Sequence, residues 1–480
     1  MNLSRRIYRL SPSQLSAETI AVTFAKTSRS PEPFDQIAAE LDAEKSAKFS
    51  EKWIVGYGHS SVAEHAVLHL ALENVSRLAI ETLESNRLAS YTEKSTRYQE
   101  WNPEAWVLAP EIAGSRFEGK YRAVMRLLFE GYAEAMEALL SWSEAATERL
   151  PGESEKAWQN RARVKAVDVS RFFLPAASMA NVGVTINARA LEYAIKKLLS
   201  SELEEVRQIG SEVKAVATQE LPTLVKYANP IESFAGIRAS LRAEAASIAE
   251  DTDSVWCKLL RAEPAGEEQV LAAALLRFSG KAYADCLLHA RSLPTSEKAA
   301  LVDVLFSQLN DFDVPLRELE YAQYDFELIM DQGAYFEFKR HRMMTQTPQA
   351  LTTRLGYAIP RAMRSAGVEA LYRHAMNAAA ALYEEIADWQ PEAAAYVVPN
   401  GFNRRALCRM NLRELFHFAK LRASANAHFS IRRAALGMAE LASAAHPLFC
   451  SKLCLPAGEN QSSVTEEYFV ETAAMPNPAD

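Results

Sequence analysis

The chain has 480 residues, of which 49% are hydrophobic and 24% are charged, and its formal net charge at pH 7 is −8. This composition is typical of a folded globular protein and excludes fibrous and broadly disordered classes. The negative balance argues against a wide nucleic-acid-binding surface, which normally needs an excess of Lys and Arg on one face. At this length we predict two domains of about 200 to 240 residues each.

The N-terminus and the cysteines are typical of a protein from a reducing compartment. The first residues run into polar sequence without an apolar core, so we expect no signal peptide. No stretch approaches the roughly 18 uncharged apolar residues that a membrane span needs. The cysteines lack a CxxC pair, which favours buried free thiols over a disulfide or metal site. They are Cys257, Cys286, Cys408, Cys450 and Cys454. We therefore expect a cytoplasmic protein without a membrane partner.

The spacing of apolar residues predicts a mostly helical chain with a few strands. Alternating segments at residues 66–75 and 324–339 are predicted strands, and each stands just before a polar motif. Helical spacing of Ala, Leu and Glu recurs in five longer stretches. These stretches are residues 121–150, 190–221, 267–290, 368–387 and 412–445. Helices mixed with a few strands in each half indicate an α+β fold class.

A long helical pattern ends near Asn229-Pro230, where a stretch with Pro, Ser and Gly follows. We place the domain boundary there. This gives a first domain at residues 1–229, a second at residues 230–457 and a loose C-terminal tail at residues 458–480. Residues 118–163 are a predicted helical insertion that only the first domain carries, and packing is its expected role.

The two halves repeat one another, and we call residues 1–229 the first copy and residues 230–457 the second copy. A Glu, a Pro and an Asn keep their order in both copies. The Pro-to-Asn interval is 12 residues in both, from Pro175 to Asn187 and from Pro399 to Asn411. The Glu lies 23 residues before Arg87 in one copy (Glu64) and 22 before Arg342 in the other (Glu320). This agreement predicts a tandem duplication.

The segment at residues 58–65 joins a glycine to two imidazoles and a carboxylate. His59 and His65 do not share a helix face at the HExxH spacing, so a metal site is disfavoured. We favour a turn whose polar groups contact a ligand. The alternative is an ordinary helix start capped by Ser60 or Ser61.

Two further polar motifs, one in each copy, are candidate ligand sites. Glu93, Ser95 and Arg97 alternate, so on an extended segment they would point to one side and could contact a base edge, a sugar hydroxyl and a phosphate. Arg340-His341-Arg342 is a cluster that repels itself unless a polyanion such as a nucleotide phosphate binds it. In isolation, a solvated salt bridge and a basic surface patch are the respective alternatives.

In this order, the motifs resemble the flavin-dependent thymidylate synthase family. Its signature is Arg-His-Arg, seven variable residues and a Ser, with a Glu two positions before that Ser. The first copy matches through Gly58-His59, Glu64-His65, Arg87 followed after seven residues by Ser95, and Asn187-Ala188-Arg189. The second copy matches through Arg340-His341-Arg342 and Asn411-Leu412-Arg413-Glu414-Leu415.

The resemblance implies two tandem domains, each a small antiparallel sheet flanked by long helices. It also implies transfer of a one-carbon unit from methylenetetrahydrofolate to dUMP, with FAD reduced by NADPH and without a metal. Arg422 would polarise the pyrimidine as a catalytic residue, together with Ser95 and Glu93. Residues lining dUMP would be Glu93, Ser95, Thr96, Arg97, Arg171 and Arg422. Residues lining the flavin would be His59, Ser61, Glu64, Arg87, Asn187, Arg189, Arg340, His341, Arg342, Asn411 and Arg413.

Each copy departs from the family pattern at different places. The first copy has Ser85-Asn86 in place of the leading Arg-His and Leu198 in place of Arg422, whereas the second has Ala395 in place of Arg171. Because these losses are complementary, we expect composite sites from both halves and a homodimer that imitates the family's tetramer. One alternative is a flavin- or nucleotide-binding scaffold or sensor without catalysis. Another is a flavin-dependent one-carbon transferase for a different pyrimidine nucleotide.

Overall fold

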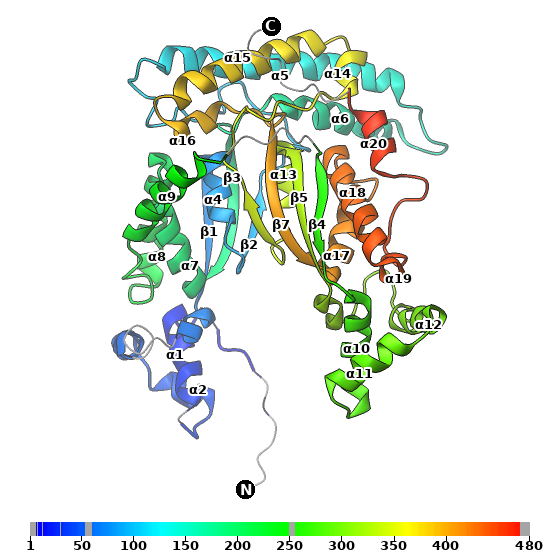
Figure 1. Ribbon diagram of the computed structural model, residues 1–480. Coiled ribbons are helices and arrows are strands. Elements are labelled where there is room, and N and C mark those ends of the chain that lie inside the picture. Colours follow the sequence, from blue (N-terminus) through cyan, green and yellow to red (C-terminus); the bar gives the residue numbers. More distant parts are fainter. Residues whose placement is uncertain are drawn as a thin grey trace. The chain divides into compact units, whose positions relative to one another are not determined.

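The computed structural model describes residues 6, 8–11, 13–28, 30–52, 60–248 and 255–470 (Figure 1). The chain forms two compact units that interleave along the sequence. The first unit is Met1–Ser95, Ala105–Gly119 and Ala177–Asp251, and the second unit is Thr96–Glu104, Lys120–Ala176 and Thr252–Asp480. The predicted boundary near residue 229 concerns the two sequence copies and stays a prediction. Part of the first copy therefore belongs to the second unit.

The first unit is built on a three-stranded antiparallel sheet with the order β1-β3-β2. Its strands are β1 (Val67–Ser76), β2 (Ala89–Glu93) and β3 (Met179–Asn187). Val184 of β3 pairs with Leu70 on one side and Tyr91 on the other, so one apolar row crosses the sheet. The other elements are α1 (Ala17–Thr27), α2 (Phe34–Ala39), α3 (Ala43–Phe49), η2 (Ser60–His65), α4 (Arg77–Glu84), α7 (Ala188–Leu199), α8 (Glu204–Glu220) and α9 (Glu232–Ala245).

The second unit is built on a four-stranded antiparallel sheet with the order β4-β5-β7-β6. Its strands are β4 (Cys257–Ala262), β5 (Gln323–Asp331), β6 (Thr345–Pro348) and β7 (Asn403–Asn411). Two long helices of the first copy, α5 (Glu118–Ala146) and α6 (Glu155–Ser170), lead into η3 (Arg171–Phe173). The second copy adds α10 (Gly266–Ser279), α11 (Tyr283–Ser292), α12 (Thr295–Phe306), η4 (Arg317–Tyr321), α13 (Gln332–Phe338), α14 (Arg361–Ser365), α15 (Glu369–Ala387), α16 (Pro391–Ala394), η5 (Ala395–Val397), α17 (Leu412–Arg422), α18 (Phe429–Ala445), α19 (Pro447–Cys450) and α20 (Gln461–Tyr468).

The two sheets repeat one plan, because β5-β7-β6 has the order and direction of β1-β3-β2. The helix starts repeat as well. The Asn187 side chain caps α7 and the Asn411 side chain caps α17, each by accepting a bond from the backbone three residues on. Such caps satisfy backbone N–H groups that the first turn leaves unpaired. The predicted α+β class with two small antiparallel sheets is thus confirmed.

Several predicted elements have different boundaries. The predicted strand at residues 324–339 ends at Asp331, because the Asp331 carboxylate accepts the Ala334 backbone N–H at 2.8 Å and starts helix α13. The predicted helices at residues 190–221, 267–290 and 412–445 are each interrupted and form α7 and α8, α10 and α11, and α17 and α18. Residues 121–150 and 368–387 match α5 and α15 closely.

The C-terminal segment was expected to be a loose tail, and this is wrong for residues 461–470. Helix α20 lies there, with Val464 and Phe469 buried. Phe469 stacks edge-on against Phe429, and the Val470 backbone N–H donates to Ile359 O at 2.9 Å. Pro and Gly in a segment therefore did not prevent docking of the apolar residues that follow them. Residues 471–480 lie outside the described part.

The cysteines are free thiols, four of them buried and Cys454 exposed. Burial raises the pKa of Cys257 and of Cys450 to about 12, so neither is a thiolate near neutral pH. Within the described ranges, no helix has the length and apolar character that crossing a bilayer requires.

Inside the second unit, one short antiparallel pairing joins the backbones of the two copies. Ala176 N donates to Val398 O at 2.9 Å, and Asn400 N donates to Leu174 O at 2.9 Å. Leu174 and Val398 occupy equivalent positions of the repeat, so the pairing has the self-complementary form of a two-fold interface. It fixes the backbone directly after Arg171, whose carbonyl accepts from the Asn400 side chain at 3.0 Å.

Glycine is required at position 401 for this pairing to close. A Cβ atom on Gly401 would lie 2.0 Å from the hydroxyl of buried Tyr372, which donates to Ala358 O. We expect Gly401→Ala to lower the free energy of unfolding by about 1–3 kcal/mol, measured by urea titration. Gly236→Ala in α9, where nothing lies within 4 Å, should instead raise it by about 0.5–1 kcal/mol. Equal effects of both substitutions would contradict this account.

Candidate functional site

Charged side chains from both copies gather in the second unit around one carboxylate. Glu337 Oε1 accepts from Arg171 Nη2 at 3.2 Å, and Glu337 Oε2 accepts from Arg422 Nη1 at 3.2 Å. The side chains of Glu337 and Arg171 are 7% and 3% exposed, whereas that of Arg422 is 19% exposed. Arg171 belongs to the first copy and the other two to the second. Two guanidinium groups therefore share one buried carboxylate, and Arg422 reaches solvent.

Arg97 adds a second ion pair to this cluster. Its Nε and Nη2 donate to the two Asp168 oxygens at 2.8 and 2.9 Å, and its Nη1 donates to Asn426 O at 3.1 Å. Burial works against the charge of Arg97, but the Asp168 carboxylate outweighs it and raises the pKa of the guanidinium. Such a bidentate pair fixes both planes. Arg97 is therefore held rigidly at the edge of the cluster.

A buried histidine continues the cluster away from Glu337. Arg422 Nε donates to His341 Nε2 at 2.9 Å, and His341 Nδ1 lies 3.0 Å from Glu414 Oε1. Burial lowers the pKa of His341 below its ordinary value, although Glu414 opposes this. The described contacts thus form an unbroken line through Glu414, His341, Arg422, Glu337 and Arg171.

Local structure places these side chains. Asp331 starts the short helix α13, so Glu337 lies on its final turn and His341 follows directly after it. Asn411 starts α17, which puts Glu414 on the first turn and Arg422 at the last residue. Asp168 and Arg171 are three residues apart at the end of α6, and this spacing puts both on one face.

Sequence reasoning grouped Arg97, Arg171 and Arg422, and the structure brings these three into one cluster. It missed the acidic partners Asp168 and Glu337 and gave Glu414 no role. One signal was present in the sequence, because Asp168 lies one helical turn before Arg171. Acidic residues are common on helix surfaces, however, and only tertiary packing identifies those that pair.

Glu93 belongs to the first unit. It forms a buried ion pair with Arg77, with 3.4 Å between Oε1 and Nη1 and side chains only 1% and 3% exposed. Strand β2 ends at Glu93, and residues 96–98 form a turn. The prediction of one extended segment through Arg97 is therefore wrong. Ser95 also belongs to the first unit, whereas buried Thr96 belongs to the second.

Several residues expected at a flavin have structural partners in each copy. In the first unit Arg189 donates to Glu64, and in the second Arg413 donates to Glu320 at 3.1 Å and to Pro315 O at 2.9 Å. Asn187 and Asn411 cap helices, as described above. Ser61 lies in η2 and Arg87 is exposed. His59 lies outside the described residues.

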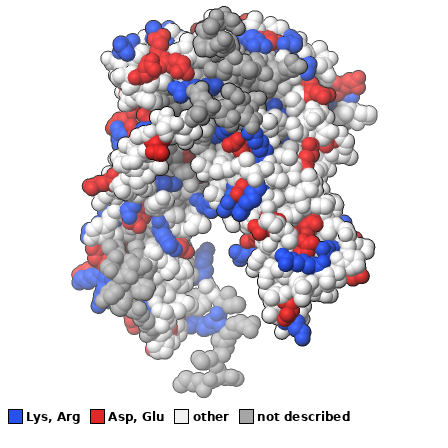
Figure 2. Space-filling model, viewed as in Figure 1, with Lys and Arg blue, Asp and Glu red and all other residues white. Residues whose placement is uncertain are grey.

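Three cations near the end of α13 could hold a diphosphate. Arg340 is exposed, whereas Arg342 and Arg413 are half-buried. Arg340 and Arg342 flank buried His341 in the sequence. Arg413 directly precedes Glu414, the partner of His341. Guanidinium groups are the preferred donors for phosphate oxygens, so this donor set fits a dinucleotide cofactor. Figure 2 shows basic and acidic side chains interspersed on the face in view.

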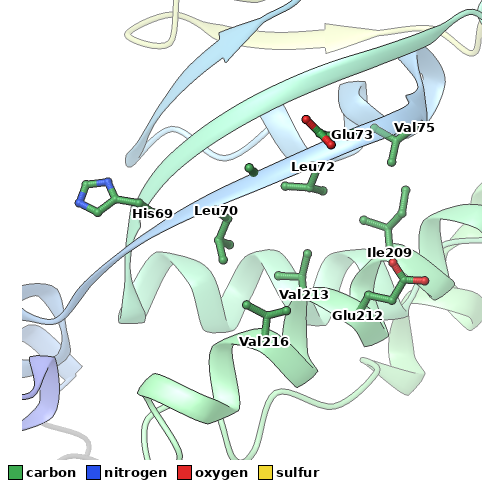
Figure 3. A pocket seen from close by; sticks show the side chains of 10 residues that line it. His69, Leu70, Leu72, Glu73, Val75, Ile209, Glu212, Val213 and Val216 are labelled. Atoms are coloured by element: carbon green, nitrogen blue, oxygen red, sulfur yellow. The ribbon is translucent and has the colours of Figure 1, made fainter.

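A pocket of about 250 Å³ lies in the first unit between β1 and α8. Leu70 and Leu72 of β1 face Ile209 and Val213 of α8 across it, and its other lining residues are His69, Ala71, Glu73, Val75, Glu212 and Val216 (Figure 3). None of the predicted site residues lines this pocket. In the second unit, β4 pairs beside the equivalent strand β5, and Trp256 lies against Gly437 of α18. In the second unit, β4 and Trp256 therefore pack beside the strand and helix that are equivalent to those of the pocket.

Comparison with known proteins identifies the family. Residues 10–223 and 258–448 each match the family described as thymidylate synthase complementing protein. These two matches cover most of the chain and lie one in each copy. The chain therefore belongs to this family, as the resemblance of its motifs indicated.

Individual relatives fall into two groups. A "UPF0159 protein" of Chlamydia muridarum is 32% identical over 432 residues, which covers 86% of this chain and 82% of the relative. One from Thermoplasma acidophilum is 24% identical and covers 85% of this chain and 88% of the relative. A "Flavin-dependent thymidylate synthase" of Clostridium tetani is 28% identical over 214 residues, which covers 44% of this chain and 82% of the relative. Both double-length and single-length relatives thus exist.

Removing the shared carboxylate should be costly. Glu337→Ala leaves the buried Arg171 and the half-buried Arg422 without their shared counter-charge, so we expect a loss of about 3–5 kcal/mol in the free energy of unfolding, measured by urea titration. Glu385→Ala breaks the exposed pair with Lys120, whose side chains are 44% and 60% exposed, and should cost less than about 1 kcal/mol. A Glu337 effect as small as this control would show that the cluster is solvated.

Proposed function

We propose that this protein methylates dUMP to dTMP in a flavin-dependent reaction with methylenetetrahydrofolate and NADPH, at a composite site in the second unit. The observation that supports this most directly is the cluster in which Arg97 and Arg171 of the first copy meet Arg422 of the second. A nucleotide monophosphate needs several cationic donors within reach of solvent. Arg97 and Arg422, with side chains 16% and 19% exposed, supply them.

Each arginine would have a different role. Arg422, held by Glu337 and His341, would direct its remaining N–H groups at the pyrimidine and stabilise negative charge that develops there. Arg171 has a buried Nε without a hydrogen-bond partner among the described residues. An unpaired buried donor is unfavourable, and a ligand oxygen would satisfy it. Glu337 would hold both guanidinium groups in place, one at each carboxylate oxygen, and its charge would offset their mutual repulsion.

Bound FAD would supply the reducing equivalents that turn the transferred one-carbon unit into a methyl group. Arg340, Arg342 and Arg413 would hold its diphosphate through charged hydrogen bonds. His341 is only 4% exposed and already has two partners, so in this proposal it acts on Arg422 and does not contact the flavin. We further propose that the chain works as a homodimer.

A second candidate function is a flavin- or nucleotide-binding scaffold or sensor without catalysis. The observation that favours it is Glu93, which belongs to the first unit and forms a buried ion pair with Arg77 there. Arg97 is likewise held on both edges by Asp168 and Asn426. The third candidate is a flavin-dependent one-carbon transferase for another pyrimidine nucleotide. It applies if a residue other than Glu93 contacts the edge of the pyrimidine base.

The purified protein should be yellow, oxidise NADPH faster when dUMP is present, and form dTMP from dUMP and methylenetetrahydrofolate. Arg422→Ala should lower kcat/KM by about a hundredfold, because a donor that stabilises developing charge is lost. Since the substitution also removes a partner of buried Glu337, the comparison is made at a temperature at which circular dichroism shows both proteins folded. Arg409→Ala, on an exposed arginine of β7 paired with Asp325, is the matched control and should keep its activity.

The outcomes separate the candidates. A colourless protein that takes up no FAD contradicts all flavin-dependent readings. Binding of FAD and dUMP without turnover supports the scaffold, and turnover with another nucleotide alone supports the third candidate. Growth of a thymidine-requiring bacterium on the wild-type gene, but not on the Arg422→Ala gene, supports dTMP synthesis.

A further inference from the structure

We propose that Glu414 and His341 are positioning residues that set the orientation of Arg422 at the candidate site. This inference rests on the proposed function, because it assigns how the arginine that faces the nucleotide is held. Arg422 has two anchors, namely Glu337 at Nη1 and His341 at Nε. One anchor would leave the guanidinium plane free to turn about the Nη1 contact, whereas two anchors fix the plane.

The contacts determine which imidazole nitrogen carries the proton. The Nε of an arginine is always a donor, so His341 Nε2, 2.9 Å away, must be the acceptor. The proton of the neutral ring is therefore on Nδ1, which lies 3.0 Å from Glu414 Oε1 and donates to it. Glu414 thus selects the tautomer that accepts from Arg422, as an acidic partner commonly does for a functional histidine.

The arrangement works only while His341 is neutral. An imidazolium would present a second N–H at Nε2, directly toward the Nε–H of Arg422, and the attractive contact would become repulsive. Around the ring, Glu414 favours the protonated form, whereas Arg422, His417 (ring centroids 5.4 Å apart) and burial oppose it. Burial has the largest effect and lowers the pKa of His341, so the ring stays neutral at pH 7 and above. The other charged groups on the adjoining segment are Glu337, Lys339, Arg340 and Arg342.

The repeat shows that this device occurs once in the chain. Counted from the helix starts at Ser76 and Asp331, Asn86 takes the place of His341. Counted from the caps Asn187 and Asn411, Ala190 and Leu198 take the places of Glu414 and Arg422. The first copy therefore lacks the arginine and both residues that would orient it. The chain therefore has one candidate site at which an arginine is oriented in this way.

The tautomer can be tested without any substrate. Nitrogen-15 NMR of the imidazole groups, assigned with His341→Gln, should show His341 neutral and protonated at Nδ1 at pH 7. His374→Gln, on an exposed residue of α15, serves as the control for assignment. A His341 ring protonated at Nε2, or charged at pH 7, overturns the proposal even if the protein has no activity with dUMP.

The orientation of Arg422 is tested by kinetics and by dUMP titration. His341→Ala should lower kcat/KM about ten- to hundredfold, the range for a lost hydrogen bond to a charged group. His341→Gln can accept from Arg422 and donate to Glu414, so it should recover most of this loss. Because Gln does not titrate, it should also remove the acid limb of the wild-type pH profile, which we expect below the ordinary histidine pKa of about 6.5. Glu414→Gln should weaken activity and leave dTMP formation detectable.

These results test the positioning role of Glu414 and His341 separately from the proposed function. If the wild type neither binds nor converts dUMP, the proposed function fails. The NMR result still shows whether His341 is in the tautomer that accepts a hydrogen bond from Arg422. If the wild type is active and His341→Ala lowers only the thermal midpoint, or if His341→Gln keeps the acid limb, His341 is merely structural and the proposal is wrong.

Discussion

The antiparallel pairing of residues 174–176 with residues 398–400 is the contact on which the candidate site depends. Two backbone hydrogen bonds join equivalent positions of the two copies, so the duplicated chain makes within itself a contact of the kind that identical subunits make across a two-fold axis. Arg171 immediately precedes this pairing, and its backbone is bonded to Asn400. The pairing thus fixes the first-copy segment whose arginine meets Glu337, which stands on α13 of the second copy.

The charge balance around Glu337 explains why the two copies could diverge in complementary fashion. A buried ion that loses its partner is strongly unfavourable, whereas a whole buried network can be replaced by uncharged residues at little cost. The equivalents of Glu337, His341, Arg422 and Arg171 in the repeat are Thr82, Asn86, Leu198 and Ala395. All four are uncharged, so the second network is missing as a set. Loss of one ion alone would have destabilised the fold, and loss of all four left ordinary packing.

Local pattern predicted the elements that stand apart from the site. The alternation of β1 and the helical spacing of α15 gave nearly correct ranges, and the resemblance grouped the three arginines. The α13 helix was missed because Asp331 acts as a cap only once the chain turns there. Glu93 and Arg97 are close in sequence but belong to different units, since β2 ends and a turn follows. Pairing of Asp168 and Glu337 with arginines depends on contacts between distant segments, which no local pattern encodes.

Comparison of the copies also separates structural roles from roles that need a ligand. Helix caps at Asn187 and Asn411 occur in both copies, as do the pairs of Glu64 with Arg189 and Glu320 with Arg413. Contacts present twice have a structural role, because each copy must start the same helix and fix the same turn. Such a role leaves other N–H groups of an arginine such as Arg413 for a ligand. The line from Glu414 to Arg171 occurs once, because Ala190, Asn86, Leu198 and Thr82 of the first copy and Ala395 of the second copy take the equivalent places. A charged network that is assembled once, from residues of both copies, therefore supports the proposal of one ligand site per chain.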